Sequence, residues 1–344
     1  MTASAPADYR AALEGAAFAE EHDAGRIFMR GRDRAALLHR LSTNDIERLR
    51  PGQGARTVVT TPIGRILDLL SVYALEDSLL LLTSAGQGPA VFKHLKSNIF
   101  FNDQVTLAPA GGSHGQLALY GPAAPALLGR LAGEGAPDLQ GLALHHTAVL
   151  QFAGAEVLVA RREPIGGQGF TLVVPVEAIP ALREALVAGG AAPLSAESRD
   201  VLRVEQGYGA FGRELSQDYI PLETGLLDAV SFAKGCYVGQ EIIARMESRG
   251  RLAKRLVGLR LSAELPVLSA KSTGSAVSAI STQHSVLAKL SVSGKEAGDL
   301  TSAVVSPRFG PIALAYVRTA HAEPGKVVEI GGGAEGEVVE LPFC

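Results

Sequence analysis

The residue whose type and setting best suit chemistry is Cys236. It lies in the octapeptide Lys-Gly-Cys-Tyr-Val-Gly-Gln-Glu, residues 234–241, and is one of only two cysteines in the chain. The glycines on either side of it let the backbone turn tightly and let another group approach closely. Lys234, two positions earlier, carries a positive charge that favours a thiolate. We therefore treat Cys236 and Lys234 as candidate catalytic residues.

The octapeptide leads into a segment with a helical pattern over residues 240–247. One face of this helix would carry the apolar residues Ile242, Ile243 and Met246. The charged residues Glu241, Arg245 and Arg249 follow one another at a spacing of four. Cys236 then precedes a helix N-terminus, whose partial positive charge also favours a thiolate. An equally open alternative is that Cys236 is a small buried hydrophobic residue, as free cysteines often are.

Two carboxylates lie in apolar surroundings. Asp68 is within Thr-Pro-Ile-Gly-Arg-Ile-Leu-Asp-Leu-Leu, residues 61–70, which reads as a strand. A buried carboxylate needs a partner or a functional reason, whereas an edge position would leave Asp68 in solvent. Glu205 follows Val-Leu-Arg-Val and precedes a glycine-rich stretch. It could accept two parallel hydrogen bonds from an amidine-like ring edge, or form an ion pair with Arg203 or Arg213.

Positive charge gathers after the octapeptide, at Arg245, Arg249, Arg251, Lys254 and Arg255. Such a group could attract the anionic tail of a ligand, although a solvated helix face is the commoner explanation. The net charge of the whole chain is −3, so nothing in its overall charge favours binding to nucleic acid or to an anionic membrane.

Other common sites lack their signatures. The eight histidines show no metal-ligand spacing, and His-Glu-x-x-His and Cys-x-x-Cys are absent, so we expect no metal site. Residues 331–336 match the dinucleotide-binding pattern G-x-G-x-x-G, but a strand rather than a helix follows them. We therefore expect a hairpin turn there.

The first half of the chain repeats a pattern. A strand ending in Gly31 or Gly121 is followed, after five residues, by Leu-Leu-x-Arg-Leu at 37–41 or 127–131. Further along, strands at 79–82 and 170–174 lead to helices at 89–95 and 180–186. These matches predict two copies of a strand-helix-strand-strand-helix unit, the ferredoxin-like pattern.

The pattern changes after residue 251. Short alternating segments at 256–261, 312–317, 326–330 and 337–341, separated by turn residues, predict a small antiparallel barrel. Residues 269–302 are rich in serine, threonine and alanine and could be a loop or poorly patterned strands.

Composition describes a globular protein of two or three domains, with 344 residues, 47% hydrophobic and 19% charged. Two cysteines cannot form a disulfide framework, which suits a reducing compartment. No signal-peptide pattern or membrane-spanning apolar run is visible, so we expect a cytoplasmic protein with no membrane contact.

The octapeptide resembles the signature of the YgfZ family, folate-binding proteins linked to iron–sulfur cluster assembly or repair. The resemblance continues through residues 219–223, 230–233, 244–245 and 249–250, and the N-terminal Leu-Ser-Thr-Asn-Asp at 41–45. The last strands are similar to the C-terminal barrel that this family shares with the glycine-cleavage aminomethyltransferase, or T-protein.

The resemblance implies an α+β fold in which two ferredoxin-like units and the barrel surround a central folate cavity. We expect the first unit over 1–112, completed by about 196–250, the second over 113–195, and the barrel over 251–344. By the same resemblance Glu205 grips the pterin ring of tetrahydrofolate, while Cys236 and Lys234 serve the iron–sulfur role. Iron–sulfur enzymes or their assembly proteins would be the partners.

We also assign Asp68, Tyr237 and Arg245 to cofactor binding. Asp68 is an additional catalytic candidate, because the main alternative is a folate-dependent aminomethyl or one-carbon transferase. The T-protein has a pair of acidic residues where this chain has Asp68 and Leu69, so one of the pair is lost. A third possibility is a scaffold that binds folate without catalysis. Tryptophan is absent, so no tryptophan can stack on the ligand.

Overall fold

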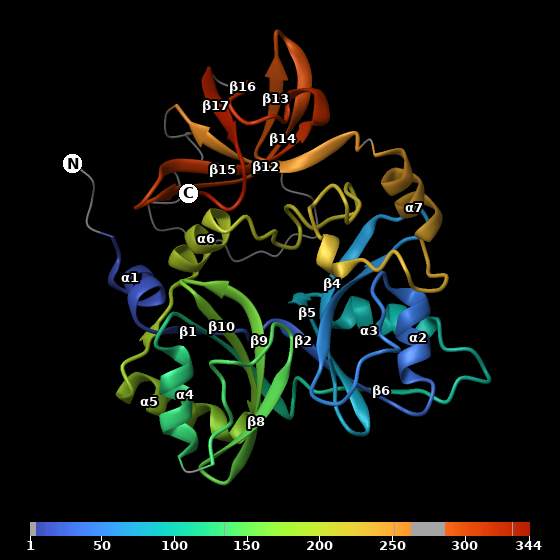
Figure 1. Ribbon diagram of the computed structural model, residues 1–344, viewed down its shortest axis with the longest axis vertical. Coiled ribbons are helices and arrows are strands. Elements are labelled where there is room, and N and C mark those ends of the chain that lie inside the picture. The colour runs from blue at the N-terminus through green and yellow to red at the C-terminus, as the bar shows by residue number, and fades with distance from the viewer. Residues whose placement is uncertain (1–4, 134, 251, 263–285, 332) are drawn as a thin grey trace.

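The computed structural model describes residues 5–133, 135–250, 252–262, 286–331 and 333–344. The chain forms two helix-covered sheets that lie next to each other, with a barrel above them (Figure 1). The predicted α+β class with a C-terminal antiparallel barrel is confirmed. Within the described residues, none of the helices combines the length and the apolar character needed to cross a bilayer.

The first sheet has the strand order β3-β4-β5-β2-β6. Its elements in chain order are β2 (Ala24–Arg30), α2 (Arg34–Leu41), β3 (Gly54–Thr60), β4 (Ile66–Ala74), β5 (Ser78–Ala85), α3 (Gly88–Ser97) and β6 (Thr106–Pro109). Helices α2 and α3 pack on one face of this sheet, because Leu37, Leu38 and Leu95 are completely buried against its strands.

The second sheet has the order β11-β1-β7-β10-β9-β8. Its elements are β1 (Ala17–Glu20), β7 (His114–Tyr120), α4 (Ala124–Ala132), β8 (Thr147–Phe152), β9 (Ala155–Ile165), β10 (Gln168–Pro175), the short helix η1 (Val176–Ala178), α5 (Ile179–Ala188) and β11 (Ala192–Pro193). Helices α4 and α5 bury one face of it through Leu127, Leu128 and Leu182.

The predicted internal repeat is present in the fold. Each unit runs strand, helix, three strands, helix, strand, which is one central strand and one final strand more than the sequence pattern indicated. Gly31 and Gly121 end the first strand of each unit with φ of 101° and 106°. A side chain there would also collide with backbone oxygen, since a Cβ on Gly31 would lie 2.0 Å from the Gln104 oxygen.

The N-terminal segment belongs spatially to the second unit. Strand β1 lies between β7 and β11, and α1 (Ala7–Glu14) packs beside it with Tyr9 and Ala12 buried. The proposed first unit, residues 1–112, therefore gives its first two elements to the second sheet. The domain boundaries remain a proposal, with α1 and β1 assigned to the second unit.

The barrel closes in the order β12-β15-β14-β13-β16-β17. Its strands are β12 (Lys254–Leu261), β13 (Ala288–Val292), β14 (Lys295–Ser306), β15 (Gly310–Arg318), β16 (Val327–Ile330) and β17 (Ala334–Val339), with the short helix η3 (Thr319–His321) between β15 and β16. Strands β16 and β17 pair as the expected antiparallel hairpin, and residues 334–336 of the glycine-rich segment already belong to β17. Of the stretch 269–302, residues 286–302 contain β13 and much of β14, and the rest lies outside the described residues.

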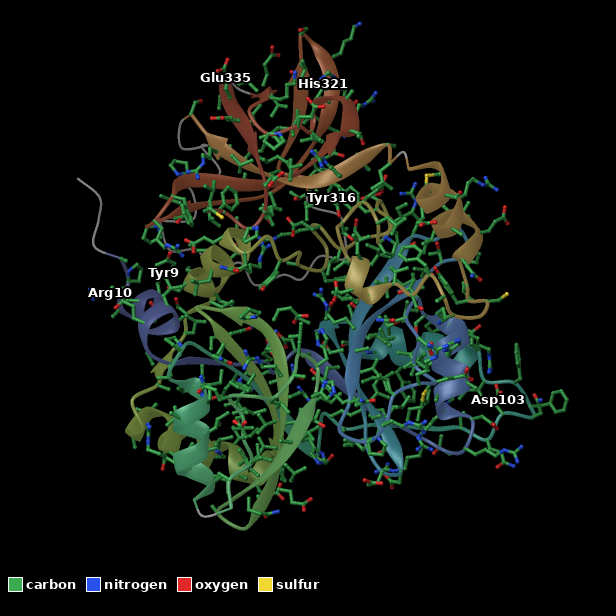
Figure 2. All side chains as sticks on the ribbon, viewed as in Figure 1. Tyr9, Arg10, Asp103, Tyr316, His321 and Glu335 are labelled. Atoms are coloured by element: carbon green, nitrogen blue, oxygen red, sulfur yellow. The ribbon has the colours of Figure 1, made fainter. Side chains whose placement is uncertain are left out.

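A connector links the three bodies. It begins with α6 (Ala196–Glu205) and contains η2 (Leu227–Ala229) and α7 (Gln240–Arg249). Tyr219 of the connector stacks on Tyr316 of β15 with ring centroids 3.4 Å apart, and the Tyr316 hydroxyl donates to the Glu214 backbone oxygen. Figure 2 shows Tyr316 at the base of the barrel, above the connector. These contacts fix the barrel on the two sheets.

Candidate functional site

Cys236 lies on an exposed loop directly before α7. The helix predicted from residue 240 is confirmed, and its apolar face is anchored by the fully buried Ile243. Gly239, with a φ of 84°, is the residue before the helix, and a Cβ there would lie 2.7 Å from the Thr61 oxygen. The loop is therefore pressed against the β3–β4 turn while the thiol faces solvent.

The side chain of Lys234 turns away from solvent and is only 9% exposed. Its ammonium group donates hydrogen bonds to the backbone oxygens of His39, Ser42 and Asn44, at 2.7 Å for Ser42 and 2.8 Å for Asn44. Burial lowers the pKa of Lys234 to about 8, while the nearby carboxylates oppose that shift. From the sequence we expected the positive charge of Lys234 to favour a thiolate at Cys236. In the structure this charge instead points at backbone carbonyl groups of the first unit.

Tyr237 and Arg245 occupy different settings. The Tyr237 ring is buried, its centroid lies 4.9 Å from the Lys234 nitrogen, and burial raises the pKa of its hydroxyl to about 12. Arg245 points into solvent and pairs with Glu241 one helical turn earlier, at 2.5 Å. Tyr237 therefore packs within the motif, while Arg245 is an accessible cation on α7.

Asp68 is completely buried in the middle of β4, which excludes the solvent-facing alternative. One carboxylate oxygen, Oδ2, accepts a hydrogen bond of 3.1 Å from the Ser84 backbone N–H, and Oδ1 has no hydrogen-bond partner. Burial raises the pKa of Asp68 to about 7. The carboxyl therefore changes its protonation state near neutral pH.

Glu205 lies at the end of α6, where α1 and the barrel meet, and is 1% exposed. Its Oε1 accepts hydrogen bonds from the Tyr9 hydroxyl at 2.6 Å and from the Ser306 hydroxyl. Oε2 has no hydrogen-bond partner, and the nearest cation is Arg308 at 3.8 Å. Figure 2 shows Tyr9 on α1 near α6. The ion pairs considered from sequence, with Arg203 or Arg213, do not involve Glu205.

The candidate residues occupy three separate places. No hydrogen bond or ion pair among the described residues joins Asp68, Glu205 and Cys236 to one another. Two cavities of about 490 Å³ and 620 Å³ lie beside β1 and α5 and on the barrel, and none of these three residues lines either one. The central folate cavity implied by the resemblance stays a proposal.

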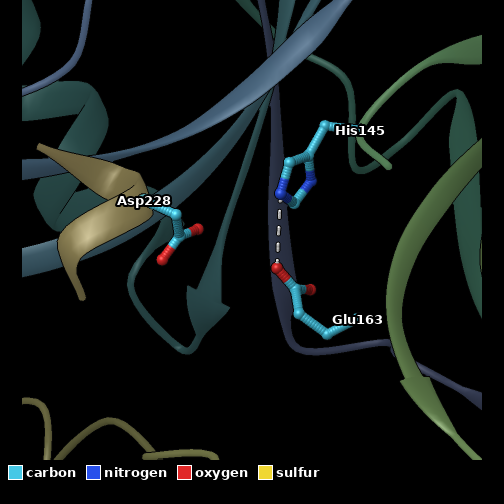
Figure 3. A group of neighbouring side chains, drawn as sticks. All are labelled: His145, Glu163 and Asp228. Carbon is cyan, nitrogen blue, oxygen red and sulfur yellow. Dashed lines mark ion pairs between the residues drawn. The ribbon is translucent and has the colours of Figure 1, made fainter. Parts of the chain in front are cut away.

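A polar cluster that the sequence did not reveal joins the two sheets. Arg56 of β3 pairs with Glu163 of β9 at 2.8 Å and, through both Nε and Nη2, with Asp228 of η2. The Nε2 atom of His145 lies 3.6 Å from Oε1 of Glu163. Figure 3 draws this ion pair, with Asp228 opposite. In the sequence His145 was one of eight histidines without metal-ligand spacing. It precedes β8 with a φ of 62°.

The ligand atoms of His145, Glu163 and Asp228 lie within 4.8 Å of one another. Arg56 already pairs with both carboxylates, so a divalent cation would have to displace a guanidinium group that makes bidentate contacts. We interpret the cluster as a group of ion pairs, centred on Arg56, that links the two sheets, and we assign no metal to it.

Comparison with known proteins gives these sites a family context. The GCVT N-terminal domain family matches residues 1–234, and the glycine cleavage T-protein C-terminal barrel domain family matches residues 254–344. In structure, the chain is similar to glycine cleavage system aminomethyltransferase T from Bartonella henselae, with a TM-score of 0.82, 23% identity, and coverage of 98% of this chain and 88% of that one. This likeness shows the shared fold.

Sequence relatives agree. A chloroplastic protein of Arabidopsis thaliana that carries a transferase name is 32% identical over 320 residues, covering 93% of this chain and 69% of that protein. The aminomethyltransferase of Chlorobaculum parvum is 32% identical over 347 residues, and that of Listeria welshimeri 29% over 345, each covering 98% of this chain and 89% of the relative. The chain belongs to the glycine cleavage T-protein family, with both its N-terminal domain and its C-terminal barrel.

Proposed function

We propose that the protein is a folate-dependent one-carbon transferase of the aminomethyltransferase type, with tetrahydrofolate or a derivative as the acceptor. The observation that carries this proposal is Asp68. A completely buried carboxyl with a pKa of about 7 and a free Oδ1 is a group that can hold or release a proton at neutral pH. Aminomethyl transfer needs such a group beside an amine nitrogen.

Folate fits the acceptors that the structure leaves open. The pterin edge presents N–H donors, and the Oε2 atom of Glu205 is a buried acceptor with no hydrogen bond, its one ion-pair contact being Arg308 at 3.8 Å. Because Oε1 is held by Tyr9 and Ser306, Glu205 offers one free oxygen rather than two. When bound, the folate supplies the nitrogen that carries the one-carbon unit. Arg245 is the proposed contact for an anionic tail.

Each residue of the chain has a limited task in this proposal. Asp68 manages a proton at Oδ1, and the backbone N–H of Ser84 keeps Oδ2 in place. The apolar neighbours of Asp68 in the first sheet, such as Leu70 and Val72, exclude water from it. Exclusion of water is what keeps the pKa of Asp68 high enough for this task.

Two measurements test the proposal together. Calorimetry with tetrahydrofolate should show binding to the wild type and weaker binding to Glu205→Ala. Transfer from an aminomethyl carrier protein should be lost in Asp68→Asn while tetrahydrofolate still binds. Binding without any transfer by the wild type would instead favour a non-catalytic folate scaffold, and absence of binding would overturn both ideas.

A second candidate is support of iron–sulfur enzymes, and the exposed thiol of Cys236 is the observation that favours it. An accessible thiol on a fixed loop can contact a partner protein. One-carbon transfer that relies on Asp68 does not require the Cys236 thiol. The test is iron–sulfur enzyme activity in cells that carry Cys236→Ala, with Cys344→Ala as the matched exposed cysteine. Unchanged activity in Cys236→Ala would remove this candidate.

A further inference from the structure

The last carbonyl groups of an α-helix have no partner within the helix and must find donors elsewhere. In α2 the Leu38 oxygen accepts a hydrogen bond of 2.8 Å from the Ser42 hydroxyl. The next two oxygens, those of His39 and Arg40, accept from Lys234 Nζ and from the Val238 backbone N–H. Two of these three donors therefore come from the octapeptide, almost 200 positions later in the chain.

The internal repeat provides a comparison. In the second unit the helix equivalent to α2 is α4, which ends at Gly133 with a φ of 72°. The Gly133 N–H bonds back to the Gly129 oxygen, so α4 closes its own end with a glycine. Helix α2 ends in Ser42 with extended backbone and has no such glycine. The octapeptide replaces the local cap that α2 lacks.

Lys234 is the centre of this cap. Besides the His39 oxygen, its ammonium group also reaches the oxygens of Ser42 and Asn44, so it holds both the helix end and the residues just after it. A cation at a helix C-terminus is additionally favoured by the helix dipole. All of this contact is directed toward the backbone.

The rest of the loop is held at both ends as well. The Val238 oxygen accepts a hydrogen bond of 2.6 Å from the Thr60 hydroxyl, and the Ser231 N–H donates to the Thr43 oxygen at 2.9 Å. Gly235 is different, since the nearest atom to a Cβ placed there is 4.0 Å away. Gly235 and the exposed Cys236 therefore form an open tip between these fixed points of the loop.

We propose that Lys234 is a positioning residue that caps α2 and thereby fixes the loop that presents Cys236, rather than a group that activates the thiol by its charge. The inference goes beyond the proposed function, since its readouts are the loop and the thiol themselves. Failure of folate binding or of transfer leaves it standing, and its own failure leaves the proposed function standing.

The test uses the full chain with Cys344→Ser, so that Cys236 is the only thiol. Lys234→Met removes the donors, Lys234→Arg keeps charge and donors, and Lys96→Met on the exposed face of α3 is the control. Hydrogen exchange is followed in peptides over 229–240 and 38–46. Alkylation of Cys236 by iodoacetamide is followed from pH 6 to pH 10.

Lys234→Met should speed exchange in both segments by about tenfold or more, the factor that loss of hydrogen bonds to a charged group implies. Barrel peptides and the Lys96→Met protein should stay at parent rates, and Lys234→Arg should restore protection. The pH dependence of alkylation should not move. If alkylation shifts to higher pH by about one unit with protection unchanged, the charge serves the thiol and the proposal is wrong. Should Lys234→Met not fold, Lys234→Gln is measured in the same way.

Discussion

The hydroxyl of Tyr9 donates a 2.6 Å hydrogen bond to Oε1 of Glu205, so the first helix of the chain is tied to the end of α6. Burial and the bond to Glu205 both raise the pKa of Tyr9, which keeps its proton on the phenol. The Ser306 hydroxyl reaches the same oxygen from the barrel. One carboxylate thus joins three parts of the chain.

Tyr9→Phe should lower the free energy of unfolding by about 1.5–3 kcal/mol, because a buried hydrogen bond to a charged acceptor is lost and no atom replaces it. The matched control is Tyr208→Phe, whose hydroxyl donates to the uncharged Pro164 oxygen at 3.0 Å. Its loss should be about 0.5–1.5 kcal/mol. Urea denaturation of both variants gives the comparison, and equal losses would mean that the bond from Tyr9 to Glu205 contributes no more than an ordinary neutral hydrogen bond.

Asp68→Asn should change how stability depends on pH. The folded-state pKa of Asp68, about 7, lies above the ordinary value of 3.8, so the folded protein keeps a proton that the unfolded chain has released. The wild type therefore loses stability between about pH 4 and pH 7 through this group, by an amount on the order of 3–4 kcal/mol at most. Asp68→Asn lacks that loss.

The stability of Asp68→Asn relative to the wild type should rise from pH 4 to pH 7 and then stay level, as measured by urea titrations at several pH values. Asp77 is an exposed control whose pKa is lowered by the Ser78 hydroxyl. For Asp77→Asn the difference from the wild type should be small or of opposite sign. A flat difference for Asp68→Asn would show that its carboxyl is not perturbed.

Arg56→Met should lower the melting temperature clearly, because Glu163 and Asp228 lose their shared cation and the link between the two sheets is cut. With the Arg56 side chain only 17% exposed, we expect about 2 kcal/mol or more. Arg48→Met is the control, since its pair with Asp45 is on the surface with Arg48 81% exposed. That loss should stay below about 1 kcal/mol.

Gly31→Ala should be strongly destabilising, by about 2 kcal/mol or more, since its φ of 101° is strained for alanine and its Cβ would meet the Gln104 oxygen. Gly112→Ala is the matched control, with open space around the added methyl group. Thermal unfolding should separate the two variants. Similar melting temperatures would mean that the end of β2 can relax.

The repeat and the barrel could be predicted because their signals are local. Apolar periodicity marks strands such as 312–317, and the pattern from Gly31 to Leu41 recurs at Gly121 to Leu131. Cys236 and Lys234 could be picked out by type and spacing. The partners of Lys234 could not, because they are backbone oxygens of a distant helix, and main-chain atoms leave no trace in the residue pattern.

The same limit applies to the ion pairs of Arg56 and to the hydrogen-bond partners of Glu205. Arg56 and Asp228 are 172 positions apart, and Tyr9 and Glu205 are 196 apart, so no local pattern in the sequence indicates either contact. The apolar neighbours of Glu205 pointed to the residue itself but not to its partners. The burial of Asp68 could be suspected from its apolar neighbours, but which of its two oxygens lacks a partner depends on how Ser84 ends β5.

Strand β1 has a consequence for how the molecule is made. It precedes every strand of the first sheet in the chain, yet it lies inside the second sheet, between β7 and β11, and β11 ends at Pro193. A nascent chain must keep this segment unpaired while the whole first sheet emerges from the ribosome. The second sheet is therefore completed only after the chain of the first sheet has been made. A fragment starting near residue 113 would expose the edge of β7 that β1 covers.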